Sequence, residues 1–364
     1  MFTLRLLLLI FLALHSTVAF TQQGGCGTRT PATALFVDQQ KLEQQRMVFS
    51  TPLLVKVFVH ITANTDGTQR AVEDTTMMRQ LKNMQQLYAS HGICFLLVGM
   101  EQINSTDLAV QDHSEELELV PFLVPDAIDI FVHRTLTDGS SSLNGTAYSV
   151  LNDYLSLDNN AVNSIDNIST LAHEMGHCFG LYHTFEDAFG VENISRGACA
   201  NCTTAGDLLC DTEADPQSDS YDPSSDINAA CNYIGNARQI CNNVSLTYQM
   251  DPRNVMSYGR RECRSLFTSG QGTRAKAIIL TTTMLINCLA EDNLTVSNSQ
   301  SVSTGRLQYA VRDNLTIDAT TFSASGSARV NLKSGNSVTL SPGVSLTPTG
   351  SAGYVWVGIS TLCR

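Results

Sequence analysis

The chain has 364 residues, and its 22 Lys and Arg against 34 Asp and Glu give a formal net charge of −12. This charge argues against a nucleic-acid partner, because phosphate contacts need clustered Lys and Arg. With 43% hydrophobic and 15% charged residues, the composition also excludes a disordered or fibrous chain. Such a length is ample for a sizeable core and predicts roughly two domains.

The first residues have the layout of a secretory signal peptide. Arg5 precedes an apolar run from Leu6 to Leu14, and the small residues around Thr17 and Ala19 form a cleavage signal. The alternative is a membrane anchor, but about nine strongly apolar residues cannot cross a hydrocarbon core of ~30 Å. No later stretch is apolar enough to span. We therefore expect a signal peptide over residues 1–19, no membrane span, and a secreted, extracellular protein.

Cysteine usage agrees with export. The chain has 11 Cys, which in an exported protein predict a disulfide framework. Six of them fall within one short window: Cys199, Cys202, Cys210, Cys231, Cys241 and Cys263. Because the total is odd, at least one thiol lacks an intrachain partner.

The first half of the chain predicts strands alternating with a helix. Residues 20–46 are polar and without periodicity, so we expect an extended leader there. The helix is predicted at Val72–Tyr88 from apolar residues at helical spacing. Strands are predicted at Leu53–Ile61, Ile93–Val98 and Asp129–His133. This alternation favours an α/β or α+β layer.

The second half changes character twice. Residues 184–255 are acidic, Cys-rich and predicted to be mostly loops, which the cysteines would staple. Thr268 or Ser269 can cap a helix at Gln271–Leu289. From about Leu294, short alternating segments are punctuated by turn pairs, at Gly335-Asn336 and Pro342-Gly343. They predict a small all-β C-terminal domain over residues 291–364.

One motif carries most of the chemistry. Residues 173–183 read His-Glu-Met-Gly-His-Cys-Phe-Gly-Leu-Tyr-His. His173 and His177 are four residues apart, so on a helix they share one face and can reach one metal ion. Glu174 stands beside them, where a carboxylate can accept a proton from metal-bound water.

The end of this motif supplies a third ligand. Gly180 can end the helix, because glycine takes a positive φ without penalty, and the turn then brings His183 back. Three neutral imidazoles leave one tetrahedral position open, which is typical of a catalytic zinc site. The alternative is three ordinary core or surface histidines. It is disfavoured because the chain has only eight His and three stand here at ligand spacing.

The long motif resembles that of the metzincin metallopeptidases, and the turn with Met256 and Tyr258 resembles their Met-turn. Over about residues 26–290 the chain resembles the pappalysin family within the metzincins. One departure is Glu213, where relatives often have Pro. The matching features are His183-Thr-Phe, Gly206-Asp207, Cys210-Asp211-Thr212, Asn254 to Tyr258, and Cys263 leading to Phe267-Thr268-x-Gly270-Gln271.

The resemblance implies a metzincin-like α/β (α+β) catalytic domain over residues 47–290. It would have a twisted mixed sheet, an active-site helix and a loop-rich lower half stapled by disulfides. It implies a zinc endopeptidase that acts on protein or peptide substrates. Glu174 would be the general base, Tyr258 would stabilise the oxyanion, and Met256 would support the metal site from below.

Two further residues gain roles from the resemblance. Glu262 stands where relatives that cleave before Arg or Lys place an acid in the substrate pocket. The alternative is a solvated loop Glu beside Arg260 and Arg261. Cys26 lies in a Cys-Gly-Thr near the start of a pro-segment, residues 20–46. Its thiolate could occupy the fourth zinc position and keep the enzyme latent.

The latency hypothesis has an alternative and a corollary. Cys26 could instead form a disulfide, for example with Cys94. If the enzyme prefers Arg on the leaving side, Gln45–Arg46 is a self-cleavage point that would remove the leader.

The resemblance also suggests staples and a second ion. It favours a Cys231–Cys263 disulfide, and one between Cys241 and either Cys199 or Cys202. Calcium could bind oxygens of a loop in which relatives bind it, with Asp207, Asp211 and Thr212 as ligands.

Two other functional classes stay open from the sequence. One is a secreted binding or adhesion protein with a vestigial metal site, which the intact Glu174 and Tyr258 argue against. The other is a different zinc hydrolase such as an amidase, which the predicted Met-turn argues against.

Overall fold

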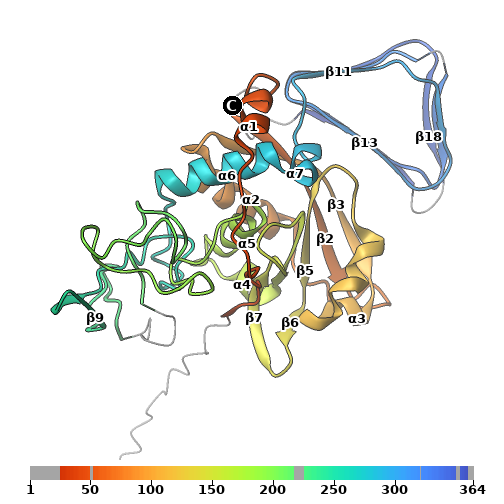
Figure 1. Cartoon of the computed structure of the whole chain (residues 1–364). Coiled ribbons are helices and arrows are strands. Elements are labelled where there is room, and N and C mark those ends of the chain that lie inside the picture. Colours follow the sequence, from red (N-terminus) through yellow and green to blue (C-terminus); the bar gives the residue numbers. More distant parts are fainter. Residues whose placement is uncertain (1–24, 50–51, 217–224, 320, 350–352, 360–364) are drawn as a thin grey trace, which may run out of the picture.

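The computed structural model describes residues 25–49, 52–216, 225–319, 321–349 and 353–359 (Figure 1). The expected signal peptide, residues 1–19, lies outside the described residues. Two bodies are visible in Figure 1, a mixed α/β part with a loop-rich extension and a triangular coil of strands at the C-terminal end. Within the described residues, no helix is both long and apolar enough to cross a membrane.

An eight-stranded twisted mixed sheet organises the α/β part. Its strand order is β3-β2-β5-β8-β7-β6-β4, and β1 joins it by pairing with β7. The strands β3, β2, β5 and β8 are mutually parallel, whereas β7 is antiparallel to both β8 and β6. The bounds are β1 Gly25–Cys26, β2 Leu53–Ala63, β3 Ile93–Asn104, β4 Val110–Asp112, β5 Ile128–His133, β6 Thr135–Asp138, β7 Ser141–Thr146 and β8 Tyr154–Asp158.

Hydrophobic burial explains the parallel half of this sheet. The β2 sequence, LLVKVFVHITA, is almost continuously apolar and nearly all of it is buried, as expected for a parallel strand covered on both faces. On one face the strands share a single core with the helices α2 (Asp74–Ala89), α5 (Thr170–Cys178) and α6 (Ser269–Thr281). The predicted strands and the helix at Val72–Tyr88 are therefore confirmed, with β2 and β3 longer than expected.

Two predicted elements are wrong. The leader is not extended throughout, because α1 forms at Gln39–Arg46, where the Asp38 side chain accepts a hydrogen bond from the Lys41 N–H and so caps the helix. The helix expected at Gln271–Leu289 is interrupted at Thr282, which takes an extended conformation (φ −97°, ψ 118°) between α6 and α7 (Thr283–Asn287). Three successive threonines stand at this break, and β-branched side chains weaken a helix. Thr268 is the cap of α6, in a capping box with Gln271.

The remaining elements are short. They comprise α3 (Thr106–Ala109), a 3-10 helix (His113–Phe122), α4 (Asn159–Asn163) and the antiparallel hairpin β9–β10 (Arg238–Cys241 and Val244–Thr247). Apart from this hairpin, the described part of the region after His183 is loop as far as α6. Three disulfides staple it: Cys199–Cys241, Cys202–Cys210 and Cys231–Cys263. The expected Cys231–Cys263 bond is confirmed, as is a partner for Cys241 within the Cys199/Cys202 pair.

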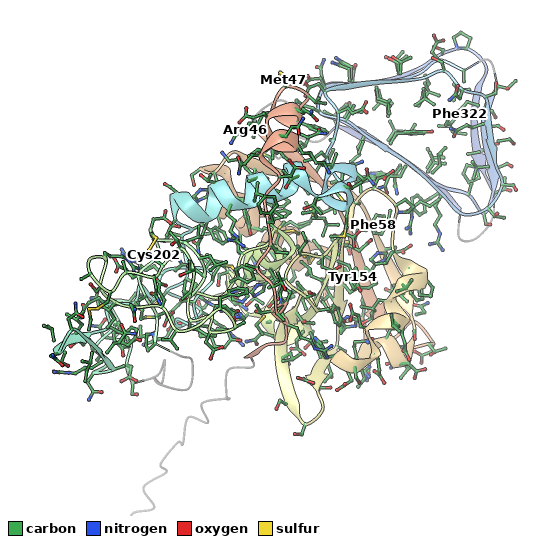
Figure 2. All side chains as sticks on the ribbon, viewed as in Figure 1. Arg46, Met47, Phe58, Tyr154, Cys202 and Phe322 are labelled. Atoms are coloured by element: carbon green, nitrogen blue, oxygen red, sulfur yellow. A yellow bond between two sulfur atoms is a disulfide. The ribbon has the colours of Figure 1, made fainter. Side chains whose placement is uncertain are left out.

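The C-terminal strands form a parallel coil with three faces. Each strand pairs in parallel with the strand three positions further along, which gives three three-stranded sheets. Apolar residues including Phe322 fill the inside of the triangle (Figure 2). The turn pairs Gly335-Asn336 and Pro342-Gly343 join successive faces. The strands are β11 Asn293–Val296, β12 Gln300–Val302, β13 Arg306–Ala310, β14 Asn314–Ile317, β15 Phe322–Gly326, β16 Arg329–Ser334, β17 Ser337–Leu340, β18 Val344–Pro348 and β19 Tyr354–Ile359.

The coil rests on β3 through charged side chains. Glu101 of β3 pairs with Arg306 and Arg329 of the coil at 2.7 and 2.6 Å, and its other oxygen contacts His60 at 3.0 Å. Lys333 donates to the Leu97 carbonyl of the same strand and lies under the Trp356 ring. The two bodies are therefore joined by buried and half-buried polar contacts beside a small apolar cluster.

Candidate active site

Helix α5 presents the first half of the motif from a fully buried position. All nine of its residues are buried, so the helix runs through the core and not along the surface. It ends at Phe179, and Gly180 follows with a φ of 76°, which favours glycine. This reversal of the chain carries His183 back toward the helix, as the sequence predicts.

The three histidines converge on one point. The Nε2 atom of His173 lies 3.2 Å from that of His177 and 3.2 Å from that of His183, and the last two are 3.1 Å apart. Four tetrahedral ligands at a zinc–nitrogen distance of 2.0–2.1 Å would lie about 3.3 Å from one another. The observed separations therefore match a shared metal ion.

Hydrogen bonds fix the tautomer of two of these rings. His173 Nδ1 lies 2.7 Å from the Val255 carbonyl, and His177 Nδ1 lies 2.8 Å from the Leu181 carbonyl. A carbonyl only accepts, so each Nδ1 carries the hydrogen and each Nε2 keeps its lone pair. Burial lowers the pKa of His177 to about 4 and holds the pKa values of His173 and His183 well below their usual range, so the rings are neutral at pH 7.

These features fit a metal centre better than a core cluster. Lone pairs that face one another at about 3 Å repel unless a cation stands between them. The Cys26 sulfur belongs to the same group, since its Sγ and the three ring nitrogens all lie within 4.8 Å of one another. Three neutral imidazoles with a thiol are a donor set that zinc prefers.

A turn below the histidines supports them. Met256 is fully buried, and its sulfur packs so closely under α5 that a Cβ on Gly176 would come within 2.6 Å of it. The Asn254 side chain accepts from the Met256 N–H and exchanges hydrogen bonds with Gln271 of α6. The Val255 carbonyl of this same turn orients His173. The predicted Met-turn thus lies directly beneath the histidine centre.

Glu174 lies beside the three rings and is 1% exposed. Its Oε2 accepts hydrogen bonds from Thr28 Oγ1 at 3.0 Å and from Cys26 Sγ at 3.4 Å. Strand β7 passes so close that a Cβ on Gly145 would fall 2.7 Å from Glu174 Cγ. Burial raises the pKa of the Glu174 carboxyl to about 7, so it can both accept and release a proton near neutral pH.

Tyr258 closes another side of the centre. Its ring packs edge-on to His183 and to Phe185, and its hydroxyl accepts a hydrogen bond from the Cys26 N–H at 3.1 Å. Burial raises the pKa of the phenol, so it remains a neutral donor at pH 7. The structure therefore brings Tyr258, Glu174 and the three histidines around one point.

The leader passes over this point. Strand β1 pairs in parallel with β7, and the Gly27 N–H continues the ladder to the Gly145 carbonyl at 3.0 Å. Cys26 has a free thiol, so the disulfide considered between Cys26 and Cys94 is absent. Thr28, which the sequence analysis did not single out, links the leader to Glu174 and accepts from the Ala147 N–H at 2.8 Å.

Comparison with known proteins agrees with this geometry. Residues 130–280 match the model of the peptidase M43 family, described as pregnancy-associated plasma protein-A. An extracellular metalloprotease of Sordaria macrospora is 25% identical over 288 residues, covering 72% of this chain and 90% of that protein. Over residues 130–280 the chain is therefore similar to the pappalysin family of metallopeptidases.

One further curated relative and one solved structure are also similar to this chain. An extracellular metalloprotease of Neurospora crassa is 25% identical over 288 residues, covering 72% of this chain and 90% of that protein. The solved structure of mature mirolysin from Tannerella forsythia, in complex with a cleaved peptide, is 18% identical with a TM-score of 0.46. The structural match covers 65% of this chain and 94% of the mirolysin chain. The disulfides and the extracellular relatives agree with export.

Glu262 lies in the loop after the predicted Met-turn. Its carboxylate accepts from Arg260 Nε at 2.6 Å, and the side chain is 47% exposed. This matches the solvated loop Glu that the sequence left open as the alternative. Two residues further along, Arg264 is buried, and the sequence analysis assigned it no role. Nothing in its local sequence distinguishes it from Arg260 and Arg261, which are only partly buried.

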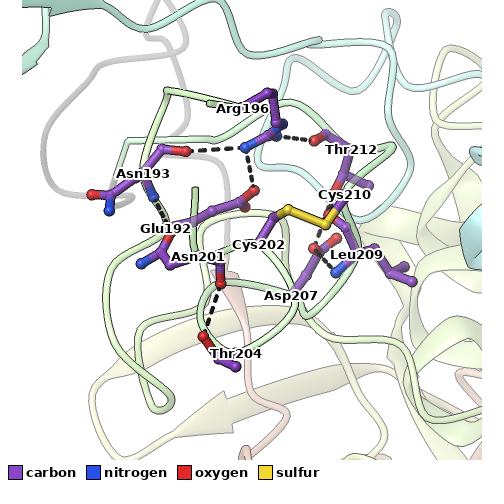
Figure 3. Close-up of a disulfide and its surroundings, with 10 residues drawn as sticks. All are labelled: Glu192, Asn193, Arg196, Asn201, Cys202, Thr204, Asp207, Leu209, Cys210 and Thr212. Atoms are coloured by element: carbon purple, nitrogen blue, oxygen red, sulfur yellow. Dashed lines mark hydrogen bonds and ion pairs between the residues drawn. A yellow bond between two sulfur atoms is a disulfide. The ribbon is translucent and has the colours of Figure 1, made fainter. Parts of the chain in front are cut away.

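The loops expected to bind calcium contain a buried acid. Asp207 Oδ1 accepts from Thr212 Oγ1 at 2.9 Å and from the Leu209 N–H at 3.0 Å, beside the Cys202–Cys210 disulfide (Figure 3). Asp211, in contrast, points to the start of α6, where it accepts from Thr268 Oγ1 and the Gly270 N–H. The expected set of Asp207, Asp211 and Thr212 is therefore not brought together as one group.

Proposed function

We propose that the protein is a secreted zinc endopeptidase that hydrolyses peptide bonds with Glu174 as general base. The observation that carries the proposal is the convergence of the Nε2 atoms of three neutral imidazoles beside a buried carboxylate. The residues His173, His177 and His183 would hold the ion. A zinc ion bound there would supply Lewis-acid chemistry and a more acidic water.

The chain's own residues divide the remaining work. Glu174 accepts a proton on its carboxylate and returns it to the leaving amine, which suits a carboxyl whose pKa lies near 7. The Tyr258 hydroxyl, a buried neutral donor, stabilises the developing oxyanion, worth roughly 3 kcal/mol if it acts as other such donors do. The Met-turn keeps His173 in the correct tautomer through the Val255 carbonyl.

A chelator assay with one variant tests this function. Casein or a fluorogenic peptide should be cleaved by the processed protein, and a zinc chelator should stop the cleavage. Glu174→Gln keeps the size of the side chain and should retain zinc while losing peptide cleavage. Cleavage by Glu174→Gln at the wild-type rate would refute the mechanism. A zinc-free active protein would refute the metal assignment. Failure to cleave any peptide would favour the binding-protein alternative.

We further propose that Cys26 keeps the precursor latent. Its Sγ lies within 4.8 Å of the nearest ring nitrogen of each of the three histidines. Its N–H donates a hydrogen bond to the Tyr258 hydroxyl. The leader strand β1 also pairs with β7, and it thereby uses backbone groups of β7 to which a substrate peptide could otherwise hydrogen-bond. Removing the leader would free the metal position, Glu174 and Tyr258 together.

The proposed self-cleavage point lies at the end of α1. Arg46 is the last helical residue and pairs with Glu43 on the surface, and Met47 after it is 84% exposed (Figure 2). Exposure makes the segment accessible, but the last helical turn has to unwind before an extended peptide can bind. N-terminal sequencing of active material tests this: a start at Arg46 supports the proposal, and a start well before it contradicts the proposal.

A preference for Arg or Lys on the leaving side depends on Glu262. Because that carboxylate pairs with Arg260, a substrate guanidinium has to displace Arg260 before it can bind. The preference therefore stays a prediction from family resemblance. Mapping cut sites with wild type and Glu262→Lys tests it, and unchanged cut sites would exclude a role for Glu262.

A structural cation near Asp207 is a second cofactor proposal. Asp207 Oδ2 is buried and has no hydrogen-bond partner among the described residues. Burial raises the pKa values of Asp207 and Glu192 to about 7 and that of Asp215 to about 8, and the three carboxyls act on one another electrostatically. A Ca²⁺ ion there would offset this repulsion. Calcium titration followed by thermal unfolding tests the proposal.

A further inference from the structure

Arg264 is a buried cation close to the proposed active site. It is 6% exposed, and its Nε has no hydrogen-bond partner. Among the described residues, no ion pair or side-chain hydrogen bond satisfies its guanidinium. Buried charges in proteins are normally paired, because an unpaired one loses its hydration without compensation.

The surroundings of Arg264 place it beside the chemistry. Two residues further along, the Leu266 carbonyl accepts from the Val255 N–H at 2.8 Å, and the Val255 carbonyl orients His173. The charge of Arg264 opposes the rise that burial causes in the pKa values of Glu174 and Tyr258. Glu174 forms no ion pair or hydrogen bond with Arg264 in the described part of the chain, where its Oε2 atom accepts from Cys26 and Thr28 of the leader.

A second arginine adds to the same charge. Arg261 is partly buried and reaches across to the Asn144 side chain on β7, one residue before Gly145, which packs on Glu174. Its charge adds to burial in lowering the pKa of Arg264 to about 10, so both remain cationic at neutral pH. The exposed Glu262 and the buried Asp158 act on Arg261 electrostatically, but neither forms an ion pair with Arg264 in the described part of the chain.

The backbone holds Arg264 rigidly in this position. It follows Cys263, which is bonded to Cys231, and its own N–H donates to the Arg260 carbonyl. The next residues return to the Met-turn through hydrogen bonds from Ser265 and Leu266 to the Arg253 carbonyl. A fixed, desolvated guanidinium is a preorganised site for a carboxylate, which it can bind through two parallel hydrogen bonds.

We propose that Arg264, assisted by Arg261, forms a carboxylate-binding subsite that selects peptides with an acidic group next to the scissile bond. The carboxylate can be an Asp or Glu side chain or the free C-terminus of a short peptide. The inference rests on the proposed peptidase function and names its substrate class. It is opposite to a basic preference through Glu262, so one peptide series decides between them.

The experiment compares peptides that differ only in one carboxylate. Processed enzyme is given fluorogenic peptides with Asp or Asn, and Glu or Gln, on either side of the scissile bond. Each is made with an amidated and with a free C-terminus, which separates the two sources of the carboxylate. We expect kcat/KM to be about 10- to 100-fold higher for the acidic member at one of these positions. Equal rates for acid and amide at every position would overturn the proposal.

Variants of the chain assign the preference to Arg264. Arg264→Met should bring kcat/KM for the acidic peptide down to that for the matching amide peptide. Arg264→Lys should keep part of the difference. Arg253→Met is the matched control, because Arg253 is exposed and already paired with Asp251. If Arg264 only tunes Glu174, Arg264→Met would lower both rates equally and keep the ratio, which also contradicts the subsite. If Arg264→Met does not fold, the preference for acidic over amide peptides is measured instead with Arg264→Lys and Arg261→Gln.

A binding measurement separates this proposal from the peptidase function. Fluorescence anisotropy of the same labelled peptides on the processed Glu174→Gln variant reports affinity without cleavage. Preferential binding of acidic peptides that is lost in the Glu174→Gln/Arg264→Met double variant supports the subsite even if no peptide is cleaved. Cleavage without any carboxylate preference leaves the peptidase function standing and removes the subsite.

Discussion

The Thr28 hydroxyl donates a hydrogen bond to the Glu174 carboxylate at 3.0 Å, across 146 positions of the chain. The same hydroxyl accepts from the Ala147 N–H beside β7 at 2.8 Å. One leader side chain thus joins the proposed general base to the segment that follows β7. If Glu174 acts as proposed, the leader occupies the base as well as the metal position.

Thr28→Val should weaken latency. Valine keeps the shape of threonine but removes both hydrogen bonds, one of them to a charged acceptor, so basal activity of the precursor should rise roughly tenfold or more. The measurement is peptide cleavage by freshly purified, unprocessed protein. Thr33→Val, at an exposed leader position, is the control. Unchanged latency in Thr28→Val would show that the Glu174 contact contributes nothing to it.

Gly145→Ala should reduce catalysis without loss of metal. The new Cβ would fall 2.7 Å from Glu174 Cγ and 2.9 Å from its Oε1, so the carboxylate has to move. We expect kcat to fall by roughly 10²-fold, because small displacements of a catalytic group are costly. Zinc content by mass spectrometry of metals should equal that of wild type. The control is Gly197→Ala, where the nearest atom to a new Cβ is Ser195 Oγ at 3.8 Å.

Asp215 should make the fold less stable at alkaline pH. Burial raises its pKa to about 8, with the charges of Asp207 and Glu192 adding to the effect. A carboxyl with a raised folded-state pKa stabilises the fold below its unfolded pKa, and this stability is lost as pH rises through about 8. In chelator, we expect a loss of roughly 1–2 kcal/mol between pH 6 and 8.

The variant Asp215→Asn checks the source of this loss. In the wild-type chain Thr184 Oγ1 donates to the Asp215 carboxylate at 2.5 Å. The asparagine amide oxygen can still accept this hydrogen bond, but the amide does not titrate. Thermal unfolding from pH 6 to 9 should therefore be flatter than for wild type. A pH profile identical to that of wild type would assign the loss to other groups.

Glu101→Gln should loosen the C-terminal coil. The change removes the charge that pairs with Arg306 and Arg329 and hydrogen-bonds to His60, contacts that lower the pKa of Glu101 to about 2. Leaving two arginines partly unpaired should cost roughly 1–3 kcal/mol. Limited proteolysis near residue 291 and thermal unfolding measure it. Glu73→Gln, in an exposed pair with Arg70, is the control and should change neither.

Local sequence predicts the parts of the molecule in which neighbours in the chain supply the contacts. The spacing from His173 to His183 needs only one helix and one turn, so the sequence alone indicates the shared metal site. The α2 helix follows from its own apolar periodicity. The Thr268 cap depends only on Gln271, three residues away.

Features that depend on distant contacts escape the same reasoning. Helix α1 is polar and buries only Leu42, so hydrophobic periodicity gives no sign of it. The coil pairs strands about 22 residues apart, as with Gln300 and Phe322, whereas alternation within a single strand does not reveal its partner. Arg264 is indistinguishable by sequence from Arg260, and only burial separates the two side chains.

The parallel coil has a consequence for how this protein can change its length. Each turn stacks only on the turns before and after it, and the contacts to β3 come from β13 and β16. A whole turn could therefore be duplicated or deleted beyond β16 without disturbing the catalytic half, as in other stacked repeats. The length of the C-terminal coil can therefore evolve independently of the α/β part of the chain.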